Sequence, residues 1–287
     1  MPFRPLPLDQ SNVRYAHGPG STVHEGVPVG TLTELSWSDS TAYPGTSRRF
    51  WVYVPAQYDR TRPASLVVFQ DGEHLMDPLD EVRATVVLDN LIHRGDLPVT
   101  IGVFVDPGVF DDPQDPEGRW NRHAEYDAFD DRYVSFLVDE IIPEVARSWS
   151  ITDDPDRRAI CGFSSGGSCA FTAAWLRPDI FRRVICSLAS FPQIRGGDPY
   201  PSLIRETPRK PLRIFMQAGH RDLGWNEPQG NWLAGNLRVA ASLAEADYDF
   251  RLVLGDGGHS TNHVGVLLPD ALRWVFRPVG ENSSEIR

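Results

Sequence analysis

One short motif constrains this chain more than any other: residues 162–166 read Gly-Phe-Ser-Ser-Gly. The apolar run before it, 158–160, is typical of a buried strand, and 169–176 after it is typical of a helix. A Gly-x-Ser-x-Gly motif between strand and helix forms a nucleophile elbow, a turn so tight that its flanking positions tolerate almost no side chain. Because such a motif also arises by chance, Ser164 is a candidate nucleophile that the rest of the chain must support.

Composition excludes some classes of protein. A formal charge of -11 disfavours nucleic acid and anionic membrane surfaces as partners, since both need a basic face. No apolar run is long enough to span a bilayer, and 1–10 has no signal-peptide core. The three cysteines lie in core-like segments without a Cys-x-x-Cys pair, which indicates buried thiols in a reducing compartment. We therefore expect a cytoplasmic protein.

Alternating strand-like and helix-like segments predict the fold class. Two alternating segments, 31–37 and 48–54, indicate an antiparallel start to the sheet. Continuously apolar runs then alternate with segments of helical period, which predicts a mostly parallel sheet with helices on both faces. The expected buried strands are 66–69, 101–105, 159–161, 184–188, 212–216 and 250–254, and the expected helices are 81–93, 130–149, 165–176, 231–246 and 264–276, with a kink at Pro143.

The sequence predicts a single catalytic domain. Residues 1–30 carry scattered Pro, Gly and Ser without a clear period, which indicates an irregular N-terminal arm. No repeat, low-complexity tract or interdomain linker follows, so 31–277 is expected to be one α/β domain, with 278–287 as a C-terminal tail.

Two later loops supply the partners that a serine nucleophile needs. Such a serine requires a general base, a carboxylate that orients the base, and donors for the oxyanion. On α/β-hydrolase sheets these residues follow in the order Ser, Asp or Glu, His, each after a later strand. Asp222 follows the strand at 212–216, and His259 lies on a glycine-rich loop after the strand at 250–254. The chain therefore has the required order.

The chain resembles the esterase family that includes the enterochelin esterases and the feruloyl-esterase-like (esterase D type) α/β hydrolases. The resemblance runs from about residue 30 to 276. It rests on the elbow and on 54–59 (Val-Pro-Ala-Gln-Tyr-Asp), 69–72 (Phe-Gln-Asp-Gly), 121–127 (Asn-Arg-His-Ala-Glu-Tyr-Asp), 230–236 (Gly-Asn-Trp-Leu-Ala-Gly-Asn) and 257–260 (Gly-Gly-His-Ser). It implies the α/β-hydrolase fold, with Ser164 as nucleophile, Asp222 as orienting acid and His259 as base.

Several of these roles have alternatives. Ser165 adjoins Ser164 but lies off the centre of the motif, so its backbone N–H is expected in the oxyanion hole. By analogy with related folds the second donor is the N–H of Glu73, with Gly72 as the close competitor. Glu227 could replace Asp222 if the loop folds back.

Metal and cofactor sites are not predicted. His263 lies four residues after His259, as two zinc ligands on a helix would, but no third ligand is convincingly placed. His220 is a further loop histidine that could line the pocket. We therefore expect neither a metal nor another cofactor.

Four residues are candidates for substrate binding. Arg122 and Glu125 lie on a loop rich in Asp, Pro and Gly, where the arginine could clamp a carboxylate, catecholate or sugar oxygen. The alternative is an Arg122–Glu125 salt bridge that holds the loop together. Trp225 and Trp232 flank the acid loop and could form a flat wall for an aromatic or sugar ring, although Trp232 also suits a core position.

We therefore expect a serine carboxylic-ester hydrolase that acts through an acyl-enzyme on a small-molecule ester, with siderophore-like and other aromatic acyl esters as the candidate substrates. A cytoplasmic location favours the siderophore branch, and an anionic siderophore would need Arg119, Arg122 and Arg221 at the mouth of the site. The alternatives are a feruloyl or acetyl esterase of carbohydrates, an acyltransferase on the same triad, and a non-catalytic binding protein. The sequence does not predict the oligomeric state.

Overall fold

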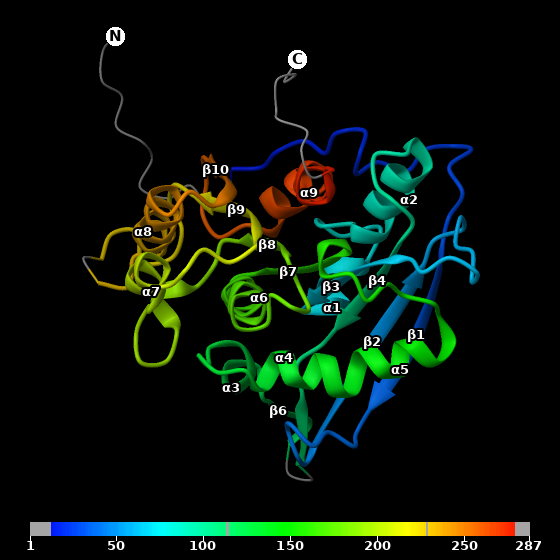
Figure 1. Cartoon of the computed structure of the whole chain (residues 1–287), viewed down its shortest axis with the longest axis horizontal. Coiled ribbons are helices and arrows are strands. Elements are labelled where there is room, and N and C mark those ends of the chain that lie inside the picture. Colours follow the sequence, from blue (N-terminus) through cyan, green and yellow to red (C-terminus); the bar gives the residue numbers. More distant parts are fainter. Residues whose placement is uncertain (1–12, 113–114, 228, 279–287) are drawn as a thin grey trace.

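The computed structural model describes residues 13–112, 115–227 and 229–278. Within them a ten-stranded sheet has the order β10-β9-β8-β7-β3-β4-β2-β5-β6, and β1 pairs with β2 (Figure 1). From β10 to β4 all neighbouring strands run parallel, which confirms the predicted α/β-hydrolase architecture. These strands are β3 (Ser65–Gln70), β4 (Thr100–Val105), β7 (Arg158–Phe163), β8 (Arg183–Ser187), β9 (Arg213–Gly219) and β10 (Asp249–Gly255).

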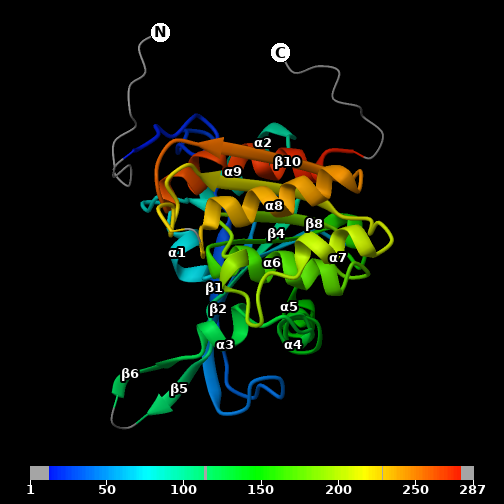
Figure 2. The same ribbon diagram turned by 90° about the vertical axis from the view of Figure 1, so that its left-hand side faces the viewer.

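The start of the sheet is antiparallel, as the alternation predicted. β1 (Thr31–Trp37) runs against β2 (Thr46–Val54), and β2 runs against β4. An unpredicted hairpin, β5 (Val109–Asp112) and β6 (Asp115–Trp120), pairs with the beginning of β2 and projects from the body (Figure 2). It was missed because 106–120 is rich in Asp, Pro and Gly and does not alternate.

Helices cover both faces of the sheet. One hydrophobic core lies under α2 (Ala84–Arg94) and α9 (Thr261–Phe276). The other lies under α4 (Arg132–Phe136), α5 (Ile142–Ser148), α6 (Ser165–Leu176), α7 (Tyr200–Glu206) and α8 (Trp232–Glu245). Within β3, Leu66 and Val68 enter one core while Val67 and Phe69 enter the other. A strand buried on both faces must therefore be apolar throughout.

The predicted helix at 130–149 is divided in the structure. A π-helical segment, Leu137–Ile141, separates α4 from α5, and Pro143 is the second residue of α5. Proline has no N–H and its ring crowds the preceding turn, so it is tolerated at the beginning of a helical segment. The expected interruption near Pro143 is therefore present, as a wider turn just before it.

The remaining elements are short. The short helices α1 (Gly72–Met76) and α3 (Arg122–Tyr126) were not predicted. Turns of 3₁₀ helix occur at Pro155–Arg157 and Phe191–Gln193. Residues 13–30 of the predicted arm contain no helix or strand, whereas 1–12 and 279–287 lie outside the described residues. Across the described residues, none of the helices has the length and apolar character needed to cross a bilayer.

Candidate active site

The chain turns sharply between β7 and α6 at Ser164. This residue has φ 59° and ψ -133°, a conformation that costs a non-glycine residue free energy and persists only where the surroundings enforce it. Its N–H donates to the carbonyl of Ser187 at 3.0 Å. A Cβ on Gly162 would lie 2.2 Å from the carbonyl oxygen of Gly166, so the turn has no room for a side chain there. The backbone therefore has the geometry that a nucleophile elbow requires.

His259 and Asp222 meet at the same edge of the sheet. Asp222 follows β9 and is fully buried, and His259 follows β10 and is partly exposed. His259 Nδ1 donates to Asp222 Oδ1 at 2.7 Å, and the N–H of Leu223 donates to the same oxygen at 2.8 Å. Since the carboxylate accepts at Nδ1, the neutral ring carries its proton there and Nε2 keeps a free lone pair. This arrangement suits a general base.

Ser164 and His259 follow parallel strands, so both lie beyond the carboxyl ends of the sheet. Among the described residues, no hydrogen bond joins the Ser164 hydroxyl to the imidazole. Without substrate, catalytic hydrogen bonds are often long and tighten only in the reacting complex. The structure therefore places the Ser164 turn and the His259–Asp222 pair beyond the same edge of the sheet.

Neither Glu227, the alternative acid, nor His263, the second histidine of the considered zinc pattern, takes part in the His259–Asp222 pair. Glu227 is exposed, and the imidazole of His259 bonds Asp222 instead. His263 is buried, stacks on Tyr15 and receives a hydrogen bond from Gln217 at 2.9 Å, and burial lowers its pKa. Among the described residues, no group of three or more His, Cys, Asp or Glu side chains could hold a metal ion.

Two helix N-termini near the elbow offer candidate backbone donors. The first N–H groups of α6 and α1 belong to Ser165 and Gly72, and the first amides of a helix have no acceptor within it. The expectation that the N–H of Glu73 is the second donor is wrong in this structure, because that N–H already donates to Asp106 Oδ1 at 3.0 Å. Gly72 is therefore the better placed candidate on this loop.

A bidentate ion pair holds the loop that carries Gly72. Arg122 donates from Nε and Nη2 to the two oxygens of Asp71, at 2.7 and 2.8 Å. Asp71 has φ 55° and is buried, and its Oδ2 would lie 3.0 Å from a Cβ on Gly166 in the elbow. The Asp71 carboxylate raises the pKa of Arg122 against the effect of desolvation. Arg122 thus binds Asp71, and the alternative, an Arg122–Glu125 salt bridge, does not form.

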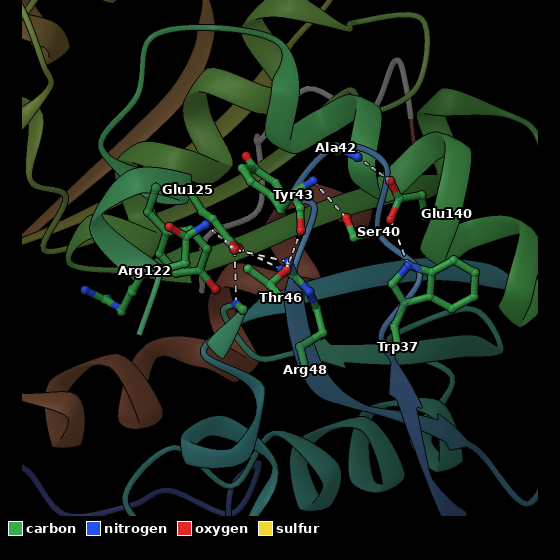
Figure 3. A network of polar contacts seen from close by, with 12 residues as sticks. Trp37, Ser40, Ala42, Tyr43, Thr46, Arg48, Arg122, Glu125 and Glu140 are labelled. Atoms are coloured by element: carbon green, nitrogen blue, oxygen red, sulfur yellow. Dashed lines mark hydrogen bonds and ion pairs between the residues drawn. The ribbon is translucent and has the colours of Figure 1, made fainter. Parts of the chain in front are cut away.

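Glu125 is not a substrate-facing residue, and this expectation is corrected. Its carboxylate and the guanidinium of Arg48 are both 0% exposed and form two hydrogen bonds, at 2.7 and 3.1 Å. Its Oε1 also accepts from the N–H of Gly108 and the side chain of Asn121. Figure 3 shows the pair inside the loop network, with Arg122 pointing away from it. Glu125 therefore holds this loop to β2 from inside the protein.

The two candidate tryptophans have different surroundings. Trp232, at the start of α8, is buried and its ring meets the His259 ring edge-on at 5.0 Å. Trp225 is partly exposed, and the guanidinium of Arg221 lies 4.2 Å from its ring centre. The N–H of His220 donates to Gly255, while the side chain of Arg119 lies outside the described residues. Trp232 packs against the candidate base, and Trp225 lies beside Arg221 in a partly exposed position.

Sequence reasoning missed the roles of Asp71, Asp106 and Arg48. A signal existed for the first two, since Asp71 and Asp106 each directly follow a buried parallel strand. The carboxyl ends of parallel strands are where such sheets carry their functional groups. No local signal marks Arg48, because its partner Glu125 lies 77 residues further along the chain.

Comparisons with known proteins show which family the chain resembles. Residues 41–274, well over half of the chain, match the family model described as "Putative esterase". Iron(III) enterobactin esterase of Dickeya dadantii (strain 3937) is 26% identical over 260 residues, covering 85% of this chain and 55% of that protein. The uncharacterized protein YbbA of Bacillus subtilis (strain 168) is also 26% identical, covering 84% and 96%. The chain thus spans about half the length of the first relative.

Solved structures share the fold at low sequence identity. The enterobactin esterase of Shigella flexneri, crystallised in the presence of enterobactin, has a TM-score of 0.69 at 22% identity, covering 86% of this chain and 60% of that one. A ferulic acid esterase has a TM-score of 0.69 at 17% identity, covering 87% and 99%. Because the family model matches residues 41–274, well over half of the chain, the chain belongs to this esterase family, and its sheet is that of the α/β-hydrolase fold.

Proposed function

We propose that the protein hydrolyses carboxylic esters through an acyl-enzyme formed on Ser164. The observation that carries the proposal is the His259–Asp222 hydrogen bond of 2.7 Å at the sheet edge where the strained Ser164 turn lies. Asp222 holds the imidazole in the tautomer whose Nε2 accepts a proton, as a serine nucleophile requires. Family membership supports ester hydrolysis, and the assignment of these three residues is ours.

In the first half-reaction Ser164 Oγ attacks the ester carbonyl carbon while His259 Nε2 takes the hydroxyl proton. The carbonyl oxygen becomes an oxyanion, for which we propose the N–H groups of Ser165 and Gly72, the first residues of α6 and α1, as donors. The tetrahedral intermediate then breaks its bond to the leaving alcohol, and His259 returns the proton to that alcohol. Water attacks the acyl-enzyme in the second half-reaction, with His259 again accepting and then donating a proton.

Two experiments test the catalytic assignment. Ser164→Ala should reduce turnover of a nitrophenyl acyl ester by about 10⁴-fold or more without loss of stability. Ser165→Ala is the matched control, because it keeps the backbone N–H and should keep activity. A fluorophosphonate probe should label the parent protein and leave Ser164→Ala unlabelled. Unchanged turnover in Ser164→Ala would exclude the proposed nucleophile.

The same assay distinguishes the two candidate acids. Asp222→Asn should lose about 10⁴-fold in kcat, because the amide favours the wrong imidazole tautomer. Glu227→Gln should keep parent activity, since Glu227 is exposed and His259 bonds Asp222. The reverse pattern would assign the acid to Glu227.

For the substrate we propose an aromatic acyl ester. Relatives are named enterobactin esterase and ferulic acid esterase, and the partly exposed Trp225 offers a flat ring close to the acid loop. A panel of linear and macrocyclic catecholate esters, feruloyl sugars and acetyl sugars, compared by kcat/KM, tests this choice. Preference for acetyl sugars would contradict it, and product ratios with added alcohol would reveal acyl transfer in place of hydrolysis.

A further inference from the structure

A second pocket lies away from the candidate active site. It has a volume of about 340 Å³ and opens between the N-terminal arm, β2 and α2, a region where Figure 1 shows the arm running past α9 and α2. Ser164, Asp222 and His259 do not line it. Its wall is mainly aliphatic, formed by Val23, Val27, Val29, Leu32, Met76 and Val86. The volume falls in the range of small-molecule sites.

Specific contacts hold the arm over this pocket. The side-chain amide of Asn90 donates to the carbonyl oxygens of Gly20 and Thr22, at 3.0 and 2.9 Å. The N–H of Gly30 donates to Asp89 Oδ1 at 2.9 Å. A Cβ on Gly30 would lie 2.4 Å from the Tyr53 ring, so the arm approaches the sheet as closely as glycine permits. The pocket is therefore built by the fold.

The polar groups of the pocket floor are acceptors. Asp89 is only 6% exposed, and its Oδ1 accepts from Tyr53 and Gly30. Asp89 Oδ2 and Asn90 Oδ1 accept no hydrogen bond from the described residues, yet neither oxygen is sealed from solvent. Asn90 cannot present its amide nitrogen instead, because that nitrogen already donates to two carbonyl oxygens. A ligand that fills this floor must therefore donate hydrogen bonds.

The charge of the floor is also uncompensated. In the part of the chain that the structure describes, Asp89 takes part in no salt bridge, and burial raises the pKa of its carboxyl group. A buried carboxylate is stabilised by a positive partner. At the rim, Val23, Val29 and Leu32 expose apolar surface that an apolar ligand would cover.

We propose that this pocket binds a primary amine with an apolar body. Its ammonium group would donate to Asp89 Oδ2 and Asn90 Oδ1, and its apolar body would lie against the aliphatic wall of the arm and α2. The site is independent of the ester-hydrolysing residues.

Calorimetric titration of the full chain with three probes of similar shape tests the ligand class. 2-Phenylethylamine should bind at least about tenfold more tightly than 2-phenylethanol, and 3-phenylpropanoate should not bind, because only the ammonium complements the carboxylate. The Ser164→Ala protein should give the same result, since that residue lies outside the pocket. Equal binding of amine and alcohol, or binding of neither, would overturn the proposal.

Two variants test the position of the site. Asp89→Asn should lose the preference for the amine over the alcohol. Val29→Arg places a competing cation at the rim, on a side chain that is 73% exposed, and should weaken amine binding at least about fivefold without affecting folding. Val29→Leu and Leu254→Arg, the latter on β10 at the far end of the sheet, are the matched controls and should bind like the parent. If Leu254→Arg weakens binding as much as Val29→Arg, the amine binds elsewhere.

Discussion

Helix α3 contributes to two arginine–carboxylate pairs that differ in their access to solvent. Glu125 binds Arg48 with both side chains 0% exposed, whereas Arg122 binds Asp71 with its own side chain 19% exposed. Both pairs are bidentate, and the two α3 residues lie only three positions apart. The Arg48–Glu125 pair connects β2 to α3, and the Arg122–Asp71 pair connects α3 to the loop that precedes α1. One short helix thus joins the scaffold to the site. Removing the first pair should therefore lower stability, and removing the second should lower activity.

The largest effect on stability is expected from the sealed pair. Glu125→Gln leaves the Arg48 guanidinium buried without a counter-charge, against the Tyr43 and Phe136 rings, and should lower the free energy of unfolding by about 3–5 kcal/mol. Urea unfolding at pH 7 measures this. Turnover per folded molecule should stay near that of the parent.

The double variant Arg48→Met with Glu125→Leu is the control, because it removes both charges. It should recover most of the lost stability, since two apolar side chains can replace a buried ion pair without an unpaired charge. A double variant no more stable than Glu125→Gln would show that hydrogen bonds to Gly108 and Asn121, and not the ion pair, stabilise the loop.

Removing the partly exposed Arg122–Asp71 pair should affect activity more than stability. Arg122→Ala frees the Asp71 loop, so kcat should fall about 100-fold, close to the loss of one oxyanion donor, while KM changes little. Guanidinium ion at millimolar concentration should restore part of the rate, because the vacated position adjoins solvent. Arg122→Lys should be intermediate, since an ammonium cannot reproduce the bidentate contact. A raised KM with unchanged kcat would instead make Arg122 a substrate clamp.

The contrast between local sequence patterns and long-range partners explains which features could be predicted from the sequence. The buried strands and α6 follow from local patterns, and the predicted bounds of that helix, 165–176, match the structure. Ser164 could also be predicted, because the tight turn around it requires glycines at neighbouring positions in the sequence. Helix α3 and the β5–β6 hairpin were missed because 106–126 has no hydrophobic period, and long-range partners hold this segment in place.

Long-range pairing also explains the misassigned residues. Glu125 was expected at the substrate because nothing near it in sequence reveals Arg48, and Glu73 was expected as a donor because nothing reveals that Asp106 takes its N–H. Local patterns identify which residues lie at the ends of strands. Only the packed structure decides which of their polar groups are already occupied.

The smallest effect should come from Asp106, a carboxylate near the Arg122–Asp71 pair whose own salt bridge, to Arg49, is long. Arg49 lies 3.8 Å away, and burial, with Glu73 and Asp71 adding repulsion, raises the pKa of Asp106 from 3.8 to about 6. Between these two values the folded state holds a proton that the unfolded state has lost. Stability therefore falls as pH rises through this window, and the full cost is present above pH 6.

Asp106→Asn should consequently be more stable than the parent at pH 8, by about 1 kcal/mol or a few degrees in Tm, because the amide carries no charge and its oxygen still accepts from Glu73. The gain should fade as pH falls towards 4, where Asp106 is protonated in the folded parent. Thermal unfolding at pH 8, 6 and 4 measures it, and Glu206→Gln, at an exposed carboxylate, should show no such trend. A gain of equal size at all three pH values would mean that packing, and not titration, distinguishes this carboxylate from the fully paired Glu125.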